Sequence, residues 1–415
     1  MKKLLTIVSV VLCLVSCQSK QDKVLDDFKA EVTDDLVNNL LPWWMDNVLN
    51  DTDYWGEVAY DGTPNPEGEK GGIVSARLIW TFSGAYRVLG DEKYKEAADK
   101  LADYFIKHFM DEEFGGVFYT LKADGEPSQV MKSTYSNAFA IYGLAEHYRA
   151  TGNQASLDAA KAIFQAFEDH IYDAEKGGYI ESHTRDWQRP ELRPGRPMMT
   201  KTMNTHIHIM EAFTNLYRVW PDETLRARLI ELVNILQTHL YNSDTHHLIL
   251  YCDDDWNHFN DADSYGHDIE TSWLLTETAE ILGDEALLES IKKQAIDMCS
   301  TTLKEGLRPD NAMMNDKRGD HYVAYSSWWC QSETMVGCIN AWQITGDFSY
   351  VEQAIKTWGF VKEFHIDKEN GGWWLNLNDD NTPKLDEFKA SMWNCPYHNS
   401  RAAYEIIERL ALMQK

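Results

Sequence analysis

Three histidines, each near the start of a separate apolar segment, are the residues of this sequence best suited to proton transfer. They are His208 in NTHIHIMEA (204–212), His267 in SYGHDIE (264–270) and His398 in WNCPYHNSR (393–401). The pKa of imidazole lies near neutrality, so one side chain can serve as an acid and as a base in the same cycle. If the fold brings the three together, they form a site for proton abstraction and return.

The first of these segments carries a second histidine, His206, which we expect to pack in the interior. Consecutive helix residues are about 100° apart, so His206 and His208 face opposite sides of a helix. His206 shares its side with apolar residues such as Phe213, whereas His208 shares its side with Asn204 and Glu211. We therefore expect the polar side of this helix to face a cavity and the apolar side to pack against the rest of the protein.

The other two histidines also have polar neighbours at helical spacing. His267 lies three residues before Glu270, and His398 lies three residues before Arg401. The remaining histidines, such as His246 and His247, are expected in solvent on loops or charged faces.

A metal site and a glycosidase site are the alternatives for such residues. Zinc sites often use a short His-x-x-x-His pair, which this sequence lacks, so we expect no metal. Glycoside hydrolysis needs two carboxylates on either side of a sugar bond. The acidic run 253–255 is interpreted as a solvated loop. Glu211, Glu270 and Glu333 are interpreted as groups that orient neighbouring side chains.

Tryptophans accompany the same segments. Aromatic rings stack on the C–H faces of sugars while polar neighbours bind the hydroxyl groups, so this composition indicates a carbohydrate ligand. The tryptophans expected around the site are Trp80, Trp328, Trp329, Trp373, Trp374 and Trp393.

The elements that must position these residues follow an internal repeat. FMDEEFGGVFY (109–119), YDAEKGGYIES (172–182) and HIDKENGGWWL (365–375) share acidic residues followed by Gly-Gly, and weaker relatives give a period of roughly 60–70 residues. Each unit contains one amphipathic helix and one helix with little charge. The helices with little charge are expected at 75–86, 133–148, 204–217, 266–275, 326–342 and 395–407.

Six two-helix units can stack as an open solenoid or close into a double ring. An open array needs polar units at its ends, and the sequence shows none. We therefore predict an all-α fold, an (α/α)6 barrel of six helical hairpins, with the weakly charged helices forming the inner ring. The site residues then meet at one end of the barrel.

The N-terminus predicts export. Residues 1–16 combine two lysines with a short apolar stretch, as a secretory signal peptide does. The ending Leu-Val-Ser-Cys resembles the lipobox of bacterial lipoproteins, which implies cleavage before Cys17 and its lipidation; ordinary export is the alternative. We expect a tether at 17–33, a barrel domain at 34–415, and a lipid-anchored protein facing the periplasm or the cell surface.

The charge and the cysteines limit the partners. A formal charge of −27 disfavours nucleic acid and anionic membrane surfaces, so the lipid anchor is the only membrane contact expected. The cysteines beyond Cys17 are odd in number and widely spaced, which argues against a disulfide framework. We expect a monomer.

Four motifs in order, namely NTHIHIMEA, SYGHDIE, SSWWCQSE (326–333) and WNCPYHNSR, resemble those of the cellobiose 2-epimerases in the N-acylglucosamine 2-epimerase superfamily. The resemblance extends from about Asp34 to the C-terminus. It implies an (α/α)6 barrel that inverts carbon 2 of the reducing-end sugar in β-1,4-linked disaccharides without a cofactor. The loop at 185–200 and the signal peptide depart from the family pattern, and they leave cellobiose and mannobiose open as substrates.

The resemblance also implies roles for individual residues. His267 and His398 would exchange the proton on carbon 2, and His208 would assist at the sugar oxygens. Arg77 matches the arginine of an Ala-Arg-x-x-Trp motif, and Trp329 and Trp393 match aromatic sugar platforms. The positions implied to line the pocket are Tyr135, Asn204, Glu270 and Glu333.

The chemistry of the residues agrees with this assignment. The hydrogen on carbon 2 becomes acidic once the sugar ring opens to an aldehyde, and its removal gives a cis-enediol. Two histidines on opposite sides can then invert the centre, while a third histidine and an arginine stabilise charge on the oxygens. The competing classes are an (α/α)6-barrel glycoside hydrolase and a catalytically silent glycan-binding lipoprotein.

Overall fold

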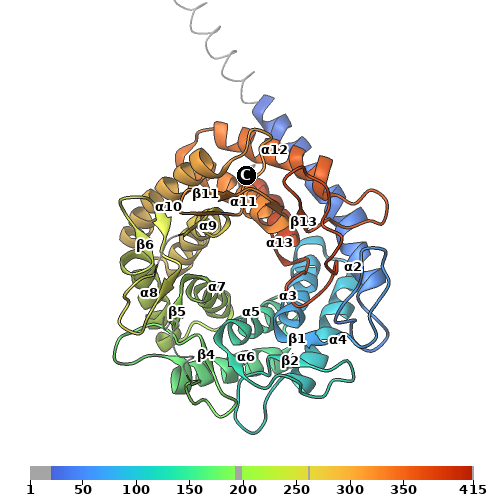
Figure 1. Cartoon of the computed structure of the whole chain (residues 1–415), viewed down its shortest axis with the longest axis vertical. Coiled ribbons are helices and arrows are strands. Elements are labelled where there is room, and N and C mark those ends of the chain that lie inside the picture. The colour runs from blue at the N-terminus through green and yellow to red at the C-terminus, as the bar shows by residue number, and fades with distance from the viewer. Residues whose placement is uncertain (1–19, 192–198, 260–261, 414–415) are drawn as a thin grey trace, which may run out of the picture.

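The computed structural model describes residues 20–191, 199–259 and 262–413, in which helices form two concentric rings (Figure 1). The expected signal peptide and Cys17 lie outside these residues. The inner ring consists of α3 (Gly72–Leu89), α5 (Thr134–Thr151), α7 (Met203–Val219), α9 (Tyr265–Leu282), α11 (Trp328–Thr345) and α13 (Tyr397–Met413). Each inner helix contacts the next, and α13 contacts α3, so the ring closes.

The outer ring lies between these helices in sequence and around them in space. It consists of α4 (Glu92–His108), α6 (Gln154–Ala166) with the π-turn η2 (Phe167–Ile171), α8 (Glu223–Thr238), α10 (Glu285–Gly306), and α12 (Ser349–Phe360) with η3 (Val361–His365). The N-terminal segment completes the ring with helical residues 20–35, η1 (Leu36–Leu40) and α2 (Leu41–Asn47).

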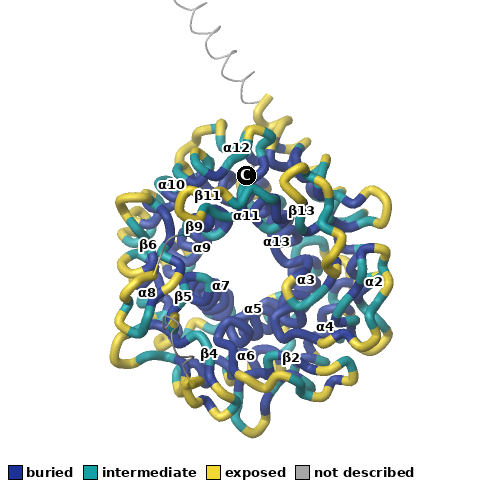
Figure 2. The backbone as a smooth tube through the Cα atoms, in the orientation of Figure 1, coloured by how far each residue is buried: buried dark blue, intermediate teal, exposed yellow. Residues whose placement is uncertain are grey.

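Composition separates the two rings. The inner helices are buried on almost every side, whereas the outer helices bury one stripe and expose the other (Figure 2). In α4, Tyr94, Ala97, Leu101 and Phe105 are buried, and the charged residues face solvent. The predicted (α/α)6 barrel with weakly charged inner helices is confirmed.

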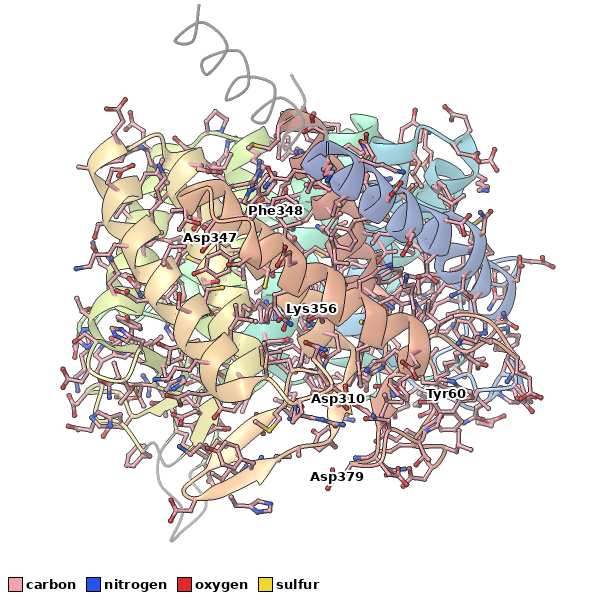
Figure 3. The ribbon with its side chains drawn as sticks, turned by 90° about the horizontal axis from the view of Figure 1, so that it is seen from above. Tyr60, Asp310, Asp347, Phe348, Lys356 and Asp379 are labelled. Atoms are coloured by element: carbon pink, nitrogen blue, oxygen red, sulfur yellow. The ribbon has the colours of Figure 1, made fainter. Side chains whose placement is uncertain are left out.

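The junctions between the rings alternate in type. At one end an inner helix passes tightly to an outer helix: Gly90 ends α3 with a left-handed φ of 74°, and Asp91 then caps α4 by accepting a hydrogen bond from the Lys93 amide. We call this end, where inner helices finish, the far end. The end where inner helices begin, which carries Tyr60, Asp310 and Asp379, is called the mouth; Asp347 and Phe348 lie at the far end (Figure 3).

The loops at the mouth contain short antiparallel strands. Pairs form between β1 (Lys70–Gly71) and β2 (Thr120–Leu121), β3 (Lys132–Ser133) and β4 (Ser182–His183), β5 (Lys201–Thr202) and β8 (Tyr251–Cys252), β6 (Tyr241–Asn242) and β7 (His247–Leu248), and β12 (Ser326–Ser327) and β13 (Asn376–Leu377). A three-stranded sheet contains β9 (Ala262–Ser264), β10 (Asp316–Arg318) and β11 (His321–Val323), with β10 in the middle. Five of these strands lead directly into inner helices: β1 into α3, β3 into α5, β5 into α7, β9 into α9 and β12 into α11.

A buried lysine fixes each of the three clearest acidic Gly-Gly loops. Lys132 at the start of β3 lies 2.8 Å from Asp111 and donates to the Gly115 carbonyl, also at 2.8 Å. Lys201 repeats this contact with Asp173 and Gly177, and Lys389 repeats it with Asp367 and Gly371. The repeat that is visible in sequence is therefore a structural clamp that fixes where the following inner helix begins.

The expected tether differs from the structure over its described part. Residues 20–35 are helical, and Leu25, Phe28 and Val32 are buried against the barrel. Their apolar residues recur at helical spacing, a pattern that extends the folded unit upstream of residue 34. None of the described helices is both long enough and apolar enough to cross a bilayer.

Candidate active site

The three histidines lie on three inner helices, each within the first six residues of its helix at the mouth. His208 lies on α7, His267 on α9 and His398 on α13. The ring of Trp329 on α11 is 4.8 Å from the ring of His267 and 5.6 Å from that of His398. Residues separated by up to 190 positions in sequence are thus brought around one point.

His208 is oriented by a carboxylate. Its Nδ1 lies 2.8 Å from Oε2 of Glu211, which makes Nδ1 the donor and leaves Nε2 as the free acceptor. Burial lowers the pKa of His208, so the neutral ring is favoured. Burial alone would raise the pKa of Glu211, but the charge of Arg401 and the bond from His208 outweigh it and lower this pKa to about 2.

His398 has an equivalent partner. Its Nδ1 lies 2.7 Å from Oε1 of Glu333, which also accepts from Arg401. Burial and the nearby positive charge of Arg401 hold the pKa of His398 well below its usual value. The ring of His398 is therefore neutral and has a fixed orientation.

His267 differs from the other two, because a hydroxyl group holds it. Its Nδ1 lies 2.7 Å from Oγ of Ser264, which can donate or accept. Burial, with the charge of His208 second, lowers the pKa of His267 to about 3. Both ring tautomers remain available to His267, whereas the carboxylates fix His208 and His398 in one.

A buried ionic network lies beneath the histidines, and we call its five residues the central layer. The Arg401 guanidinium binds Glu211, Glu270 and Glu333 from three different helices, and Tyr397 donates to Glu211. Burial raises the pKa of Glu270 well above its usual value, with the charge of Glu333 second. Arg401 supplies the positive charge that these carboxylates need in the interior.

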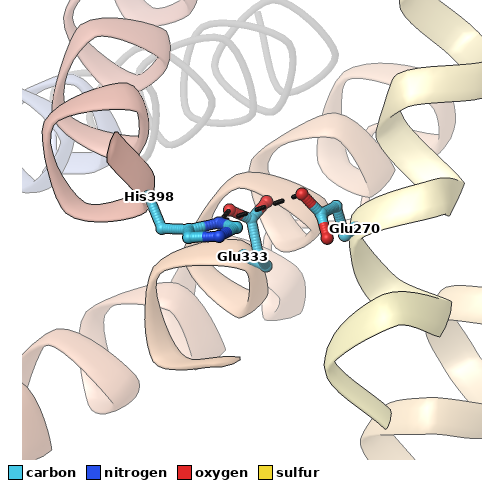
Figure 4. A group of neighbouring side chains, drawn as sticks. All are labelled: Glu270, Glu333 and His398. Atoms are coloured by element: carbon cyan, nitrogen blue, oxygen red, sulfur yellow. Dashed lines mark hydrogen bonds and ion pairs between the residues drawn. The ribbon is translucent and has the colours of Figure 1, made fainter. Parts of the chain in front are cut away.

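Two carboxylates of the central layer, together with His398, have donor atoms that could suit a cation. Ligand atoms of Glu270, Glu333 and His398 lie within 4.8 Å of one another (Figure 4). However, Nη2 of Arg401 binds the Oε1 atoms of both Glu270 and Glu333. A guanidinium therefore holds the position that a metal ion would need.

Arg77 lies on α3. No carboxylate group among the described residues binds its guanidinium. Its Nη2 donates to the Tyr135 hydroxyl at 2.8 Å, and its Nη1 lies 3.7 Å from Sγ of Cys395. The guanidinium lies over the rings of Phe139 and Tyr397, with distances of 4.1 and 4.7 Å to the ring centres. A buried charge of this kind is available to an oxygen of a ligand.

The expected pocket-lining residues are divided between the mouth and the central layer. Tyr135 lies 5.1 Å from His208 and 5.9 Å from Trp393, between ring centres, and Trp393 is 51% exposed. Oδ1 of Asn204 is buried and has no hydrogen-bond partner among the described residues, so it is free to bind a ligand hydroxyl. Glu270 and Glu333 lie below, where they bind Arg401.

Two of the tryptophans expected around the site lie elsewhere. Trp80 stacks on Tyr142 at a ring distance of 5.3 Å and lines a cavity at the far end. The Trp373 indole donates to Asp35 at 2.9 Å, on the outer ring. A sequence shows the position of a tryptophan but not the direction of its ring: Trp373 follows Gly372 in a mouth loop, but its ring turns to the outer ring.

The other histidine predictions had mixed outcomes. His206 is buried as expected: Nδ1 bonds to the Thr202 carbonyl at 2.7 Å, and Nε2 accepts from the Tyr179 amide. The expectation that the remaining histidines are solvated is wrong for His147, His183 and His365, which are buried, and also for His247. His247 is buried between Asp268 and Glu305, which outweigh burial and raise its pKa to about 9. The described cysteines are all free, as expected.

Sequence reasoning missed Arg401, Tyr397 and Ser264 as parts of the site. The three-residue spacing between His398 and Arg401 was visible, but the three carboxylates around Arg401 come from distant helices. The signal that could have found Arg401 is its charge on a helix expected in the inner ring.

The far end contains a cavity of about 460 Å³. Its charged groups pair with one another: Arg87 binds Glu146 and Glu408, and Arg218 binds Glu277. Glu211 lines this cavity as well, so the central layer separates it from the histidines. These paired charges stabilise the far end, whereas Arg77 has no carboxylate partner among the described residues.

Comparison with known proteins agrees with this arrangement. The N-acylglucosamine 2-epimerase (GlcNAc 2-epimerase) family model matches residues 54–402, and the chain belongs to this family. The family membership makes the chain a carbohydrate epimerase or isomerase.

Individual relatives match over nearly their whole length. A cellobiose 2-epimerase from Bacteroides fragilis is 39% identical over 386 residues, which cover 91% of this chain and 98% of that protein. One from Ruminococcus albus is 33% identical, with coverage of 92% and 98%. The solved structure of cellobiose 2-epimerase from Bacillus thermoamylovorans has a TM-score of 0.88 and 33% identity, and the match covers 92% of this chain and all of that one.

Proposed function

We propose that this protein reversibly epimerises carbon 2 of the reducing-end sugar in β-1,4-linked disaccharides, converting cellobiose to glucosyl-mannose, without a cofactor. The observation that carries this proposal is the set of three neutral histidines, each held through Nδ1, around an arginine with no carboxylate partner among the described residues. Such groups can move protons at carbon and stabilise negative charge at oxygen.

In the proposed mechanism, the ring opens and the aldehyde exposes the hydrogen on carbon 2. One of His267 and His398, whose rings both contact Trp329, takes the proton from carbon 2 as a neutral base, and the other, which has first taken up a proton from solvent, delivers it to the opposite face of the cis-enediol. His208 and Arg77, which both contact Tyr135, assist ring opening and stabilise the enediol oxygens. The proton that leaves one face is replaced on the other, so the mass of the sugar is unchanged.

The arrangement favours epimerisation over glycoside hydrolysis. Hydrolysis needs one carboxyl group to donate a proton and another to act as nucleophile or base. Glu211, Glu270 and Glu333 instead bind Arg401, and Glu211 and Glu333 also orient histidines. A glycan-binding role without catalysis would not need three oriented bases.

The test is to incubate the protein with cellobiose and with mannobiose in deuterium oxide and to separate the products. Epimerisation gives a disaccharide with solvent deuterium at carbon 2. Monosaccharides would indicate hydrolysis, and unchanged substrate in both reactions would contradict the proposal. Relative rates identify the preferred disaccharide. Treatment with a chelator should leave the rate unchanged, because Arg401 holds the cation position in the central layer.

We further propose that the protein is exported, lipid-anchored at Cys17 and active as a monomer. The Leu-Val-Ser-Cys sequence supports the anchor, and the contribution of every proposed site residue by one chain supports the monomer. Radiolabelled fatty acid should appear in the wild type and be absent from Cys17→Ser. Light scattering of Cys17→Ser should give the mass of one chain.

A further inference from the structure

We propose that the far end of the barrel lies against the lipid surface and that the mouth opens away from it. This inference rests on the proposed lipid anchor at Cys17 and is independent of the proposed reaction. It concerns an interaction surface, the apolar corner, which consists of Val24, Leu412 and Met413.

The first observation is where the N-terminal helix begins. Along residues 20–40 the chain runs from the far end toward the mouth: Asn39 bonds to Gly372 in a mouth loop, whereas Ala30 lines a groove with Ala411, near the end of α13. An α-helix rises 1.5 Å per residue, so residue 20 lies about 15 Å farther along than Ala30. Figure 3 shows the helix beginning at the end that carries Asp347.

The second observation is the length of chain that remains to the anchor. Lys20 is the third residue after Cys17, and an extended chain spans at most about 3.6 Å per residue. A lipidated Cys17 therefore lies within about 11 Å of the start of this helix. Such a short connection keeps the far end close to the bilayer.

The third observation is that apolar side chains are exposed near the start of the N-terminal helix and at the end of α13, whose neighbouring residues Ala30 and Ala411 share a groove. Val24 is 38% exposed on the N-terminal helix, and Leu412 and Met413 are 66% and 53% exposed at the end of α13. Leucine and methionine side chains at an exposed helix end are suited to insertion among lipid headgroups. The anchor and the corner thus fix the same end of the barrel to the membrane.

The consequence for the site is access from outside. His267 and His398 lie at the starts of inner helices, at the opposite end from the corner. A disaccharide in solution then reaches the histidines without passing between the protein and the lipid.

A matched pair of fluorescent labels tests the orientation. Asp347→Cys at the far end and Asp379→Cys at the mouth are both exposed positions, and the described native cysteines are buried. The lipidated full-length variants are placed in phosphatidylcholine vesicles that carry a quencher on the lipid headgroup. We expect at least twofold stronger quenching at Asp347→Cys than at Asp379→Cys. Equal quenching, or stronger quenching at Asp379→Cys, would overturn the orientation.

Further variants separate the anchor from the corner. Adding Cys17→Ser should abolish quenching at both labels. If the labelled proteins that keep Cys17 show no quenching, the protein is not anchored to the vesicle and the proposal is wrong. Leu412→Glu should weaken quenching at Asp347→Cys, whereas Leu385→Glu, a leucine 65% exposed near the mouth, should leave it unchanged. If Leu412→Glu and Leu385→Glu change the quenching equally, the apolar corner does not contact the lipid. Epimerisation, assayed separately, does not enter these readouts.

Discussion

Arg77 and Arg401 are buried in the same inner ring, with 3% and 1% of their surfaces exposed, but their surroundings are opposite. Arg401 binds three carboxylates, whereas Arg77 contacts a hydroxyl group, a thiol and aromatic rings. The charge of Arg401 is therefore used within the protein to hold the groups that orient histidines. The charge of Arg77 has no carboxylate partner among the described residues, and we propose that it stabilises the substrate oxygens.

The largest effect is expected for Arg401→Met. Removing one member of a buried ionic network leaves carboxylates without a counter-charge, which typically costs about 3–5 kcal/mol. We expect a loss of this size in the free energy of unfolding, measured by denaturant titration, together with loss of epimerisation. Arg77→Met should destabilise the fold much less. Equal destabilisation by the two would remove the distinction between the arginines.

The two histidines proposed to exchange the proton on carbon 2 come next. His267→Asn and His398→Asn should each lower the epimerisation rate by about a hundred- to ten-thousandfold, as loss of a positioned acid or base does. His206→Asn is the control and should cost far less activity, because His206 bonds to Thr202 and Tyr179 in the wall. Steady-state kinetics and circular dichroism of all three variants separate catalysis from folding. Retained activity in both single variants would refute the assignment.

Arg77→Met should lower kcat/KM by about a hundred- to a thousandfold, the usual effect of losing one donor to a developing oxyanion. Arg77→Lys should recover part of it, because a lysine keeps the charge without the planar geometry. Steady-state kinetics with the preferred disaccharide measures the loss of activity, and thermal unfolding shows whether the variants remain folded. A change in KM alone would assign Arg77 to ground-state binding.

The smallest effect is in the pH dependence of stability. Because Arg401 helps to lower the folded-state pKa of Glu211 to about 2, from an ordinary value of 4.5, Glu211 stabilises the fold above pH 4.5. This contribution is lost as the pH falls from 4.5 toward 2. The stability difference between wild type and Glu211→Gln should therefore shrink over this range, whereas that between wild type and Arg77→Met should stay constant. Urea titrations at several pH values measure both.

The fold could be predicted well from the sequence, because the features that indicate it lie close together along the chain. Acidic Gly-Gly loops and helices of contrasting charge recur along the chain, and both rings follow from them. The histidines were identified from helical phase for the same reason. The partners of Arg401 were not predicted, because Glu211 and Arg401 are 190 residues apart and meet only after the ring closes. The clamp lysines, such as Lys132, were missed because an isolated lysine in sequence is usually exposed.

The central layer also determines how sugars exchange at the site. Tyr397, Glu211 and Arg401 are buried and bonded to one another, so the route from the far end to the histidines is blocked. Among the described residues, the mouth is then the opening through which both the substrate and its epimer reach the histidines. In the proposed reversible reaction both sugars bind in turn at this one site, so each sugar should act as a competitive inhibitor of the other's conversion.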